Sequence, residues 1–131
     1  MGDEDGDLAV APGVDLAHPV HLLFVTTPDA AVARSLARAL VEERLAACGN
    51  IVPAIASVFR WQGTVQEETE ALLILKTSSA RVAELCARVV ELHPYDVPEV
   101  LSLGVDDGHG EYLDWLGECI APGGRSNGTQ A

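Results

Sequence analysis

Histidine and cysteine are the side chains of this chain best suited to bind a metal ion. The sequence contains four histidines and three cysteines, and imidazole and thiolate are ligands that copper and zinc prefer. His93 lies directly before Pro94, where a helix is expected to end, and Cys48 follows the apolar residues 45–47. Each also has a structural alternative, because a histidine at a helix C-terminus interacts favourably with the helix dipole and a small thiol often packs in a core.

A second group of residues is suited to line a pocket for a small ligand. Lys76 is the only lysine of the sequence and follows the apolar residues 72–75. A buried lysine needs a partner, and Glu99 is a candidate. Together with Trp61 and Tyr95, these residues would combine apolar walls with a few polar groups, as small-molecule sites do. The alternative for Lys76 is a surface side chain whose stem covers apolar surface.

Catalytic motifs are missing from the sequence, so we expect the protein not to be an enzyme. It has no glycine-rich phosphate loop and no GxSxG or HExxH motif. Its adjacent acids, such as Asp106 and Asp107, point apart on a helix or strand and indicate solvated surface. With 8 Lys and Arg against 20 Asp and Glu, the net charge is −12. That charge argues against nucleic-acid binding and would attract cations.

The strands that must position these residues are visible as apolar and β-branched runs. We expect four of them, at residues 20–26, 51–61, 64–76 and 98–105. Gln62 and Gly63 are suited to a tight turn between the second and third strands, because glycine tolerates a positive φ there.

Helices are expected between the strands, where apolar residues recur at spacings of three and four. The first would start after the N-cap Thr27 and end near Ala46, and the second would start after the N-cap Ser78 and end at Pro94. A short third helix is expected at residues 112–119. The order βαββαβ plus a terminal helix predicts an α+β, ferredoxin-like fold with two helices on one face of an antiparallel sheet.

The central hairpin is longer than one small domain can cover. Residues 64–76 would extend roughly 43 Å as a strand, whereas a usual strand spans about 17–20 Å. The excess would expose backbone and the side chains of Val58, Trp61 and Val65. We therefore predict a homo-oligomer whose hairpins add strands to neighbouring sheets. The alternative is a hairpin that bends back onto its own domain.

The two ends of the chain differ in composition from the body. Residues 1–17 carry five acids and no base, residues 121–131 are rich in small polar residues, and neither end is apolar enough to fold. The domain is therefore expected at residues 18–120. The sequence has no apolar run long enough to span a membrane, and three widely spaced cysteines suggest free thiols in a reducing compartment. These features predict a cytoplasmic protein.

Several ordered segments resemble the CutA family of divalent-cation tolerance proteins. These segments are LVEERLAAC at 40–48, NIVP at 50–53, SVFRWQG at 57–63, LKT at 75–77, HPYDVPE at 93–99 and YLDWL at 112–116. The resemblance covers roughly residues 20–120. It implies a ferredoxin-like homotrimer, a link to tolerance of copper and other divalent metals, and no catalytic activity. It also implies a likeness to the PII signalling proteins in fold and trimeric state.

The resemblance also implies a copper-ligand set that this chain keeps only in part. Val25 and Leu92 stand where some bacterial members have a cysteine and a histidine, so of those three ligands only His93 remains. Cys48 is a typical family position.

Two hypotheses follow from these residues. In the first, a non-enzymatic trimer binds copper or another divalent cation weakly at clefts between subunits, through His93 with Cys48 and carboxylates as further ligands. In the second, a PII-like signalling or scaffold trimer binds a small ligand or a protein partner. Its cleft would be formed by four residues: Trp61, Lys76, Tyr95 and Glu99.

Overall fold

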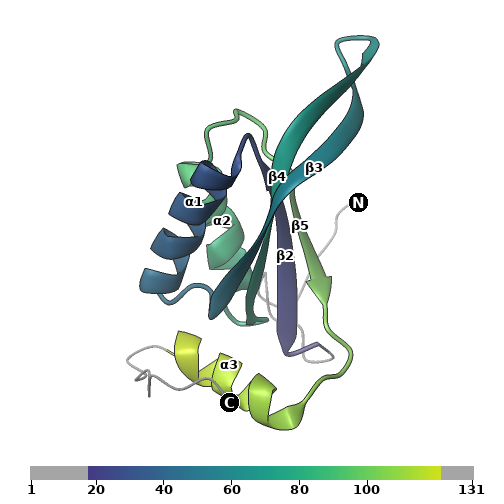
Figure 1. Cartoon of the computed structure of the whole chain (residues 1–131). Helices are drawn as coiled ribbons and strands as arrows, with labels where there is room; N and C mark the ends of the chain where they lie inside the picture. The colour runs from purple at the N-terminus through teal and green to yellow at the C-terminus, as the bar shows by residue number, and fades with distance from the viewer. Residues whose placement is uncertain (1–17, 122–131) are drawn as a thin grey trace, which may run out of the picture.

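The computed structural model describes residues 18–121, which form a four-stranded antiparallel sheet and three helices (Figure 1). The strand order is β3-β4-β2-β5, and α1 and α2 lie together on one face of the sheet. This arrangement confirms the ferredoxin-like α+β fold. The elements in chain order are β2 (Val20–Thr27), α1 (Ala30–Glu42), β3 (Cys48–Trp61), β4 (Thr64–Ser78), α2 (Val82–Leu92), β5 (Val100–Gly104) and α3 (Gly110–Ile120). The tails predicted at 1–17 and 121–131 lie outside the described residues, except for residue 121 itself.

Helix α1 begins two residues later than predicted. Thr27 is the last residue of β2, and its buried hydroxyl donates to the carbonyl oxygen of Asp29 at 2.8 Å. The N-cap is Asp29, whose carboxylate accepts a hydrogen bond from the Val32 N–H at 2.8 Å. Threonine and aspartate both suit an N-cap, and Thr27 is unavailable because β2 extends through it.

Helix α1 also ends earlier than predicted, at Glu42. The N–H of Leu45 donates to the Leu40 carbonyl at 3.0 Å, and the N–H of Arg44 donates to the Val41 carbonyl at 3.0 Å. These two bonds form a Schellman C-cap, in which the residue after the cap adopts a left-handed conformation. Arg44 occupies that position with φ of 62°, so a non-glycine residue stops the helix.

The other boundaries shift because strands continue further than the apolar pattern indicates. Ser78 does not cap α2, since β4 includes it, and the N-cap is Arg81, with no side-chain hydrogen bond to the helix. Strand β3 begins at Cys48, so this residue lies in a strand and not at the end of a helix. Strand β5 is shorter than predicted, with five residues.

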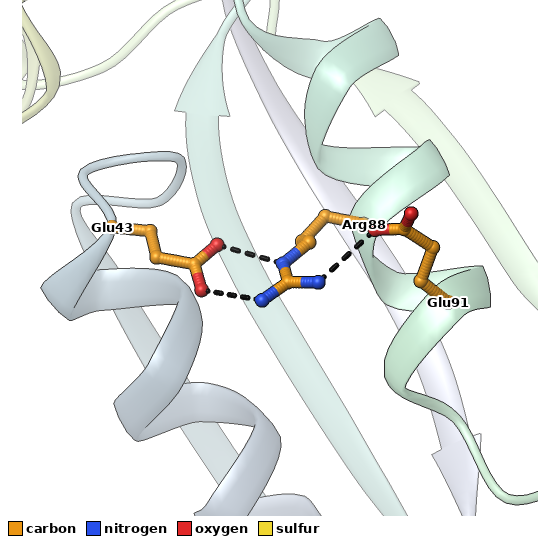
Figure 2. A network of polar contacts seen from close by, with 3 residues as sticks. All are labelled: Glu43, Arg88 and Glu91. Carbon is orange, nitrogen blue, oxygen red and sulfur yellow. Dashed lines mark hydrogen bonds and ion pairs between the residues drawn. The ribbon is translucent and has the colours of Figure 1, made fainter.

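The core lies between the sheet and the two helices α1 and α2. Side chains alternate along β4, so Leu73 and Leu75 point to the helices with no exposed surface. Gly49 on β3 lets α1 approach closely, because a Cβ there would lie 3.0 Å from the Cβ of Ala37. Outside the core, Arg88 of α2 binds the Glu43 carboxylate through two hydrogen bonds of 2.9 Å and thereby links the two helices (Figure 2).

Helix α3 packs at the lower end of the sheet in Figure 1 and buries a second, smaller apolar cluster. Ala47, Leu116 and Ile120 form the buried part of this cluster. Two arginines hold the C-terminal end of the helix: Arg44 donates to the Cys119 carbonyl at 3.3 Å and Arg81 to the Ile120 carbonyl at 3.2 Å. The terminal helix therefore closes the end of its own sheet.

The β3–β4 hairpin projects beyond the rest of the domain, as the sequence predicts (Figure 1). Strand β4 pairs with β2 only from Ala71 onward, and residues 64–70 pair with β3 alone. An irregularity in the β3–β4 pairing at residues 52–55 separates this projection from the sheet, at a proline that cannot donate to the ladder. We call residues 55–70 the arm. Gln62 and Gly63 form its turn, both with positive φ.

Candidate functional site

A pocket of about 790 Å³ lies where the arm joins the sheet. Its volume falls within the range of small-molecule sites. Three parts of the chain form it: strand β2, the arm with the adjoining part of β4, and the connection between α2 and β5. Its lining residues are Phe24, Thr26, Ile55, Ser57, Val58, Phe59, Trp61, Gln66, Glu68, Glu70, Leu72, Tyr95, Asp96, Val97 and Glu99.

The pocket opens on the face of the sheet that α1 and α2 leave uncovered. Along β4, Glu68, Glu70 and Leu72 alternate with the helix-facing Ala71 and Leu73 and therefore point to the opposite face. Phe24 pairs with Leu101 on this same face, where Leu101 is 55% exposed.

A chain of hydrogen bonds leads from β2 through His93 to the pocket. The Nε2 atom of His93 lies 2.7 Å from the Thr26 carbonyl oxygen and donates to it. Its Nδ1 accepts a hydrogen bond from the Tyr95 N–H at 3.0 Å. The Tyr95 hydroxyl in turn donates to Oε2 of Glu70 at 2.9 Å. Because both ring nitrogens bond to backbone groups, His93 links β2 to the loop that carries Tyr95 and positions that loop.

Tyr95 keeps its proton over a wide pH range. Burial, followed by the hydrogen bond to Glu70 and the nearby carboxylates, raises the pKa of Tyr95 to about 12. The hydroxyl is therefore a permanent donor to Glu70 at neutral pH.

Three of the four residues predicted to share a pocket do so: Trp61, Tyr95 and Glu99 all line it, and Lys76 does not. Lys76 points to the same face of β4 as Glu70 but lies six residues further along, roughly 20 Å away in a strand. Glu99 is exposed in the connection before β5 and is not the partner of Lys76.

Lys76 belongs instead to a small cluster under α3. Its Nζ donates to the Tyr112 hydroxyl at 3.4 Å and lies 5.6 Å from the centre of the Tyr112 ring. Cys48 pairs with Lys76 across the strands, and its Sγ is 3.8 Å from the same hydroxyl. Burial is the main cause of a raised pKa at Tyr112, strengthened by Cys48 and opposed by Lys76.

The predicted metal ligands His93 and Cys48 do not come together in one chain. Both ring nitrogens of His93 are engaged by backbone groups. Cys48 lies opposite Lys76, whereas His93 contacts Thr26 at the other end of β2. Within residues 18–121, no three side chains of the kinds that ligate metals are grouped closely enough to hold an ion. These residues therefore do not form a metal centre within a single described chain.

Sequence reasoning missed most of the residues that line the pocket, and among the residues that it missed Glu70 and Tyr112 make the most specific contacts. In the sequence, Glu70 belongs to the polar run before residue 71, which indicates an exposed acid. In the structure it is buried beside the loop that carries Tyr95, which is distant in sequence. The only local signal is that Glu68 and Glu70 share their face with the apolar Leu72. Tyr112 reads as one apolar position of α3, and nothing in the sequence indicates that it contacts Cys48.

Fold and site together define a class: ferredoxin-like α+β domains with a projecting β-hairpin and a ligand-sized pocket at its base. The family model described as CutA1 divalent ion tolerance protein matches residues 21–119 of the chain. The chain therefore belongs to the CutA family, whose members are named for tolerance of divalent cations.

Named relatives and solved structures agree with this assignment. The divalent-cation tolerance protein CutA of Thermus thermophilus is 53% identical over 97 residues, covering 74% of this chain and 94% of that protein. Human CutA is 45% identical over 97 residues, and the match covers 54% of its length, so this chain corresponds to about half of the human protein. The solved T. thermophilus structure has a TM-score of 0.75 at 50% identity and covers 78% of this chain and 99% of its own.

One solved relative is named for a cellular compartment. A solved relative from Archaeoglobus fulgidus, with a TM-score of 0.75 at 35% identity over 77% of this chain and 98% of its own, is described as a periplasmic divalent cation tolerance protein. In residues 18–121 of the present chain, none of the helices has the length and hydrophobicity needed to cross a membrane.

Proposed function

We propose that this protein is a non-enzymatic, cytoplasmic homotrimer in divalent-cation tolerance, and that it acts by binding a small ligand in the pocket at the base of the arm. The observation that carries the proposal is the arm itself. It holds one wall of the pocket in place and exposes surface that its own domain does not cover.

The arm supports assembly because it leaves apolar side chains and backbone groups without intrachain cover. Val58 and Val65 are 64% and 65% exposed, and Trp61 is 55% exposed. Residues 64–70 of β4 pair with β3 on one side only. Open edges of this kind pair with other chains unless they are protected. Since β5 is the short edge strand at the far side of the sheet, it is a suitable edge for a neighbour's arm, and a ring of three closes such contacts.

The mass of the assembly tests the first part of the proposal. Light scattering after size exclusion is expected to give about 41 kDa, three times the chain mass of 13.8 kDa. Leu101→Glu, which places a charge on the open sheet face, is expected to dissociate the assembly. Val90→Glu is the matched control, because Val90 is similarly exposed on α2, away from the open face. A monomer mass for the unmodified chain would contradict the trimer.

The pocket supports ligand binding as the mode of action. It joins aromatic walls, among them Trp61 and Tyr95, to a few fixed polar groups, and Tyr95 is held by hydrogen bonds on both sides. Such preorganised, partly apolar pockets suit small molecules.

Direct binding of copper or another divalent cation is a second candidate, favoured by the family's name and by the net charge of −12. Because one chain does not group the ligands, His93 and Cys48 would each need donors from a neighbouring subunit. Calorimetric titration of the assembled protein with Cu²⁺ tests this candidate, with His93→Asn and Cys48→Ser as variants. Binding that both substitutions leave unchanged would remove these two residues as ligands.

A further inference from the structure

The arm has two faces that differ in what covers them. Because side chains alternate along a strand, the pairing of β3 with β4 separates an inner face, which lines the pocket, from an outer face. The inner face consists of Ile55, Ser57, Phe59, Trp61, Gln66, Glu68 and Glu70. The outer face consists of Ala56, Val58, Arg60, Val65, Glu67 and Thr69, all of them exposed, and Val58 also borders the pocket. The described part of the chain therefore leaves its own outer face uncovered.

The outer face carries a positive charge that has no partner in its own chain. Arg60 is the only base within residues 55–70. It forms no ion pair with the described residues, and its guanidinium donates only to the Gly63 carbonyl of the arm's own turn, at 3.5 Å. The two valines beside it, Val58 and Val65, are 64% and 65% exposed. The outer face thus joins a cation to an apolar surface.

The pocket has the complementary properties. Its lining contains four carboxylates and, among the described residues, no lysine, arginine or histidine. Aromatic side chains, among them Phe59 and Trp61, supply its apolar surface. A pocket of about 790 Å³ holds an arginine side chain with space remaining. The outer face of one chain therefore matches the pocket of another in charge and in polarity.

One carboxylate of the pocket is best placed to receive an arginine. Glu70 is already bonded to the Tyr95 hydroxyl, whereas Glu68 is exposed and forms no ion pair with the described residues. Glu68 pairs across the strands with Ser57, whose small side chain leaves space beside the carboxylate. A guanidinium that enters over Ser57 meets Glu68 first.

We propose that the arms assemble head to tail, so that the outer face of one arm lies in the pocket of the next chain and its Arg60 forms an ion pair with Glu68 there. This inference rests on the proposed function in that it takes the chain to assemble through its arm. It adds which faces meet, and it makes the pocket a site of two chains, completed by the neighbour's arginine. Arginine suits this role because its planar guanidinium binds a carboxylate through two hydrogen bonds.

Such a contact also determines the symmetry of the assembly. Two different surfaces meet in it, so the contact is heterologous, and heterologous contacts close into rings. A two-fold dimer that joined outer face to outer face would leave the carboxylates of both pockets unpaired. The distribution of charge therefore favours a ring over such a dimer.

Reversal of the two charges tests the ion pair. Arg60→Glu places a carboxylate against Glu68, and Glu68→Arg places a guanidinium against Arg60. Each is expected to raise the concentration at which half of the chains are assembled by about a hundredfold. The double variant Arg60→Glu/Glu68→Arg restores the pair and should assemble within about tenfold of the unmodified chain. Light scattering over a dilution series measures these concentrations, and circular dichroism checks that each chain is folded.

The matched control separates a specific pair from general repulsion between acidic chains. Arg60→Glu/Glu118→Arg has the same net charge as the restoring double variant, but Glu118 lies on the exposed side of α3. It should assemble as poorly as Arg60→Glu alone. Equal recovery in both double variants would overturn the ion pair and assign the effect to net charge.

An equal mixture of the two single variants tests the ring. Contacts between unlike chains in the mixture pair opposite charges, but a ring of three must contain at least one contact between like chains. The mixture should therefore assemble better than either variant alone and less well than the restoring double variant. Recovery equal to that of the double variant would contradict a ring with an odd number of chains.

The unmodified chain distinguishes failure of this inference from failure of the proposed function. If it has the mass of a monomer, the proposed assembly is wrong, and this inference with it. If it forms a trimer that Arg60→Glu and Glu68→Arg leave unchanged, the assembly stands and the contact between outer face and pocket is refuted.

Discussion

The two halves of the β3–β4 hairpin differ in what covers them. At the base, Leu73 and Leu75 are fully buried under α1 and α2, and α3 closes the lower end. In the arm, Val58 and Val65 remain about two-thirds exposed on the same two strands. A continuous pair of strands thus passes from a domain core to a surface without intrachain cover. The difference shows that strand pairing alone does not decide burial, which depends on the elements packed against each face.

The largest effect is expected from truncation at the base. Leu73→Ala should lower the free energy of unfolding by about 2–5 kcal/mol, because a cavity remains where a fully buried side chain was. Val65→Ala, in the arm, should change the unfolding of an isolated chain by no more than about 0.5 kcal/mol. Urea unfolding of both variants measures the difference. A large loss for Val65→Ala in a chain with monomer mass would show that the arm packs on its own domain, as in the bent-hairpin alternative.

Helix α3 allows a finer test, because it covers the base of the hairpin and leaves the arm uncovered. Arg44 adopts a left-handed backbone conformation with φ of 62°, which is strained for a non-glycine residue, and its side chain donates to the Cys119 carbonyl. Arg44→Ala keeps the backbone strain and loses the hydrogen bond, so it should destabilise by about 1 kcal/mol. Arg44→Gly loses the same bond but relieves strain of roughly 1 kcal/mol, and should unfold close to the unmodified chain.

Hydrogen exchange of the α3 amides distinguishes docking of the helix from global stability. Both Arg44 variants should exchange faster in α3, because each lacks the bond to Cys119, while Arg81 still holds Ile120. Equal stability of the glycine and alanine variants would mean that the left-handed conformation carries no cost here.

The same comparison explains which features the sequence predicts. Burial at the base follows from the continuous apolar run at residues 71–75 of β4, and the arm follows from strand length and from the turn residues Gln62 and Gly63. These signals are local. The N-cap of α1 is predicted wrongly, at Thr27 instead of Asp29, because the pairing of β2 with β4 extends through Thr27 and no local signal shows this.

The site is predicted in part for the same reason. Trp61, Tyr95 and Glu99 share a pocket as expected. Lys76 is separated from them because it lies near the opposite end of β4 from the arm, where it pairs with Cys48 and contacts Tyr112. Glu70 is buried by a loop from a distant part of the chain.

A moderate effect is expected at the junction between base and arm. Tyr95→Phe removes the hydrogen bond to Glu70 and should lower stability by about 1 kcal/mol at neutral pH. The pKa of Tyr95 is raised from 10 to about 12 in the fold, so the folded state binds more protons than the unfolded state in this interval. Stability from this group is therefore complete below pH 10 and is lost as the pH rises to about 12. Thermal unfolding should show a shallower alkaline decline in Tyr95→Phe; parallel curves would contradict the raised pKa.

The smallest effect is expected on the outer face of the base, where Arg88 joins Glu43 and Glu91 (Figure 2). The hydrogen bonds from Arg88 lower the pKa of Glu43 below its ordinary 4.5. The unfolded state therefore binds more protons near that pH, and the contribution is present above it and lost as the pH falls through the folded pKa. In Glu43→Gln, the melting temperature should fall slightly less steeply as the pH is lowered. Added salt should reduce the difference between this variant and the unmodified chain, because the ion pair is solvent-accessible. Glu118→Gln, on the exposed side of α3, should leave the acid fall in melting temperature unchanged. If both variants reduced the acid fall in melting temperature equally, that fall would be due to the net charge of the chain. The helices α1 and α2 would then be joined by their apolar contacts alone.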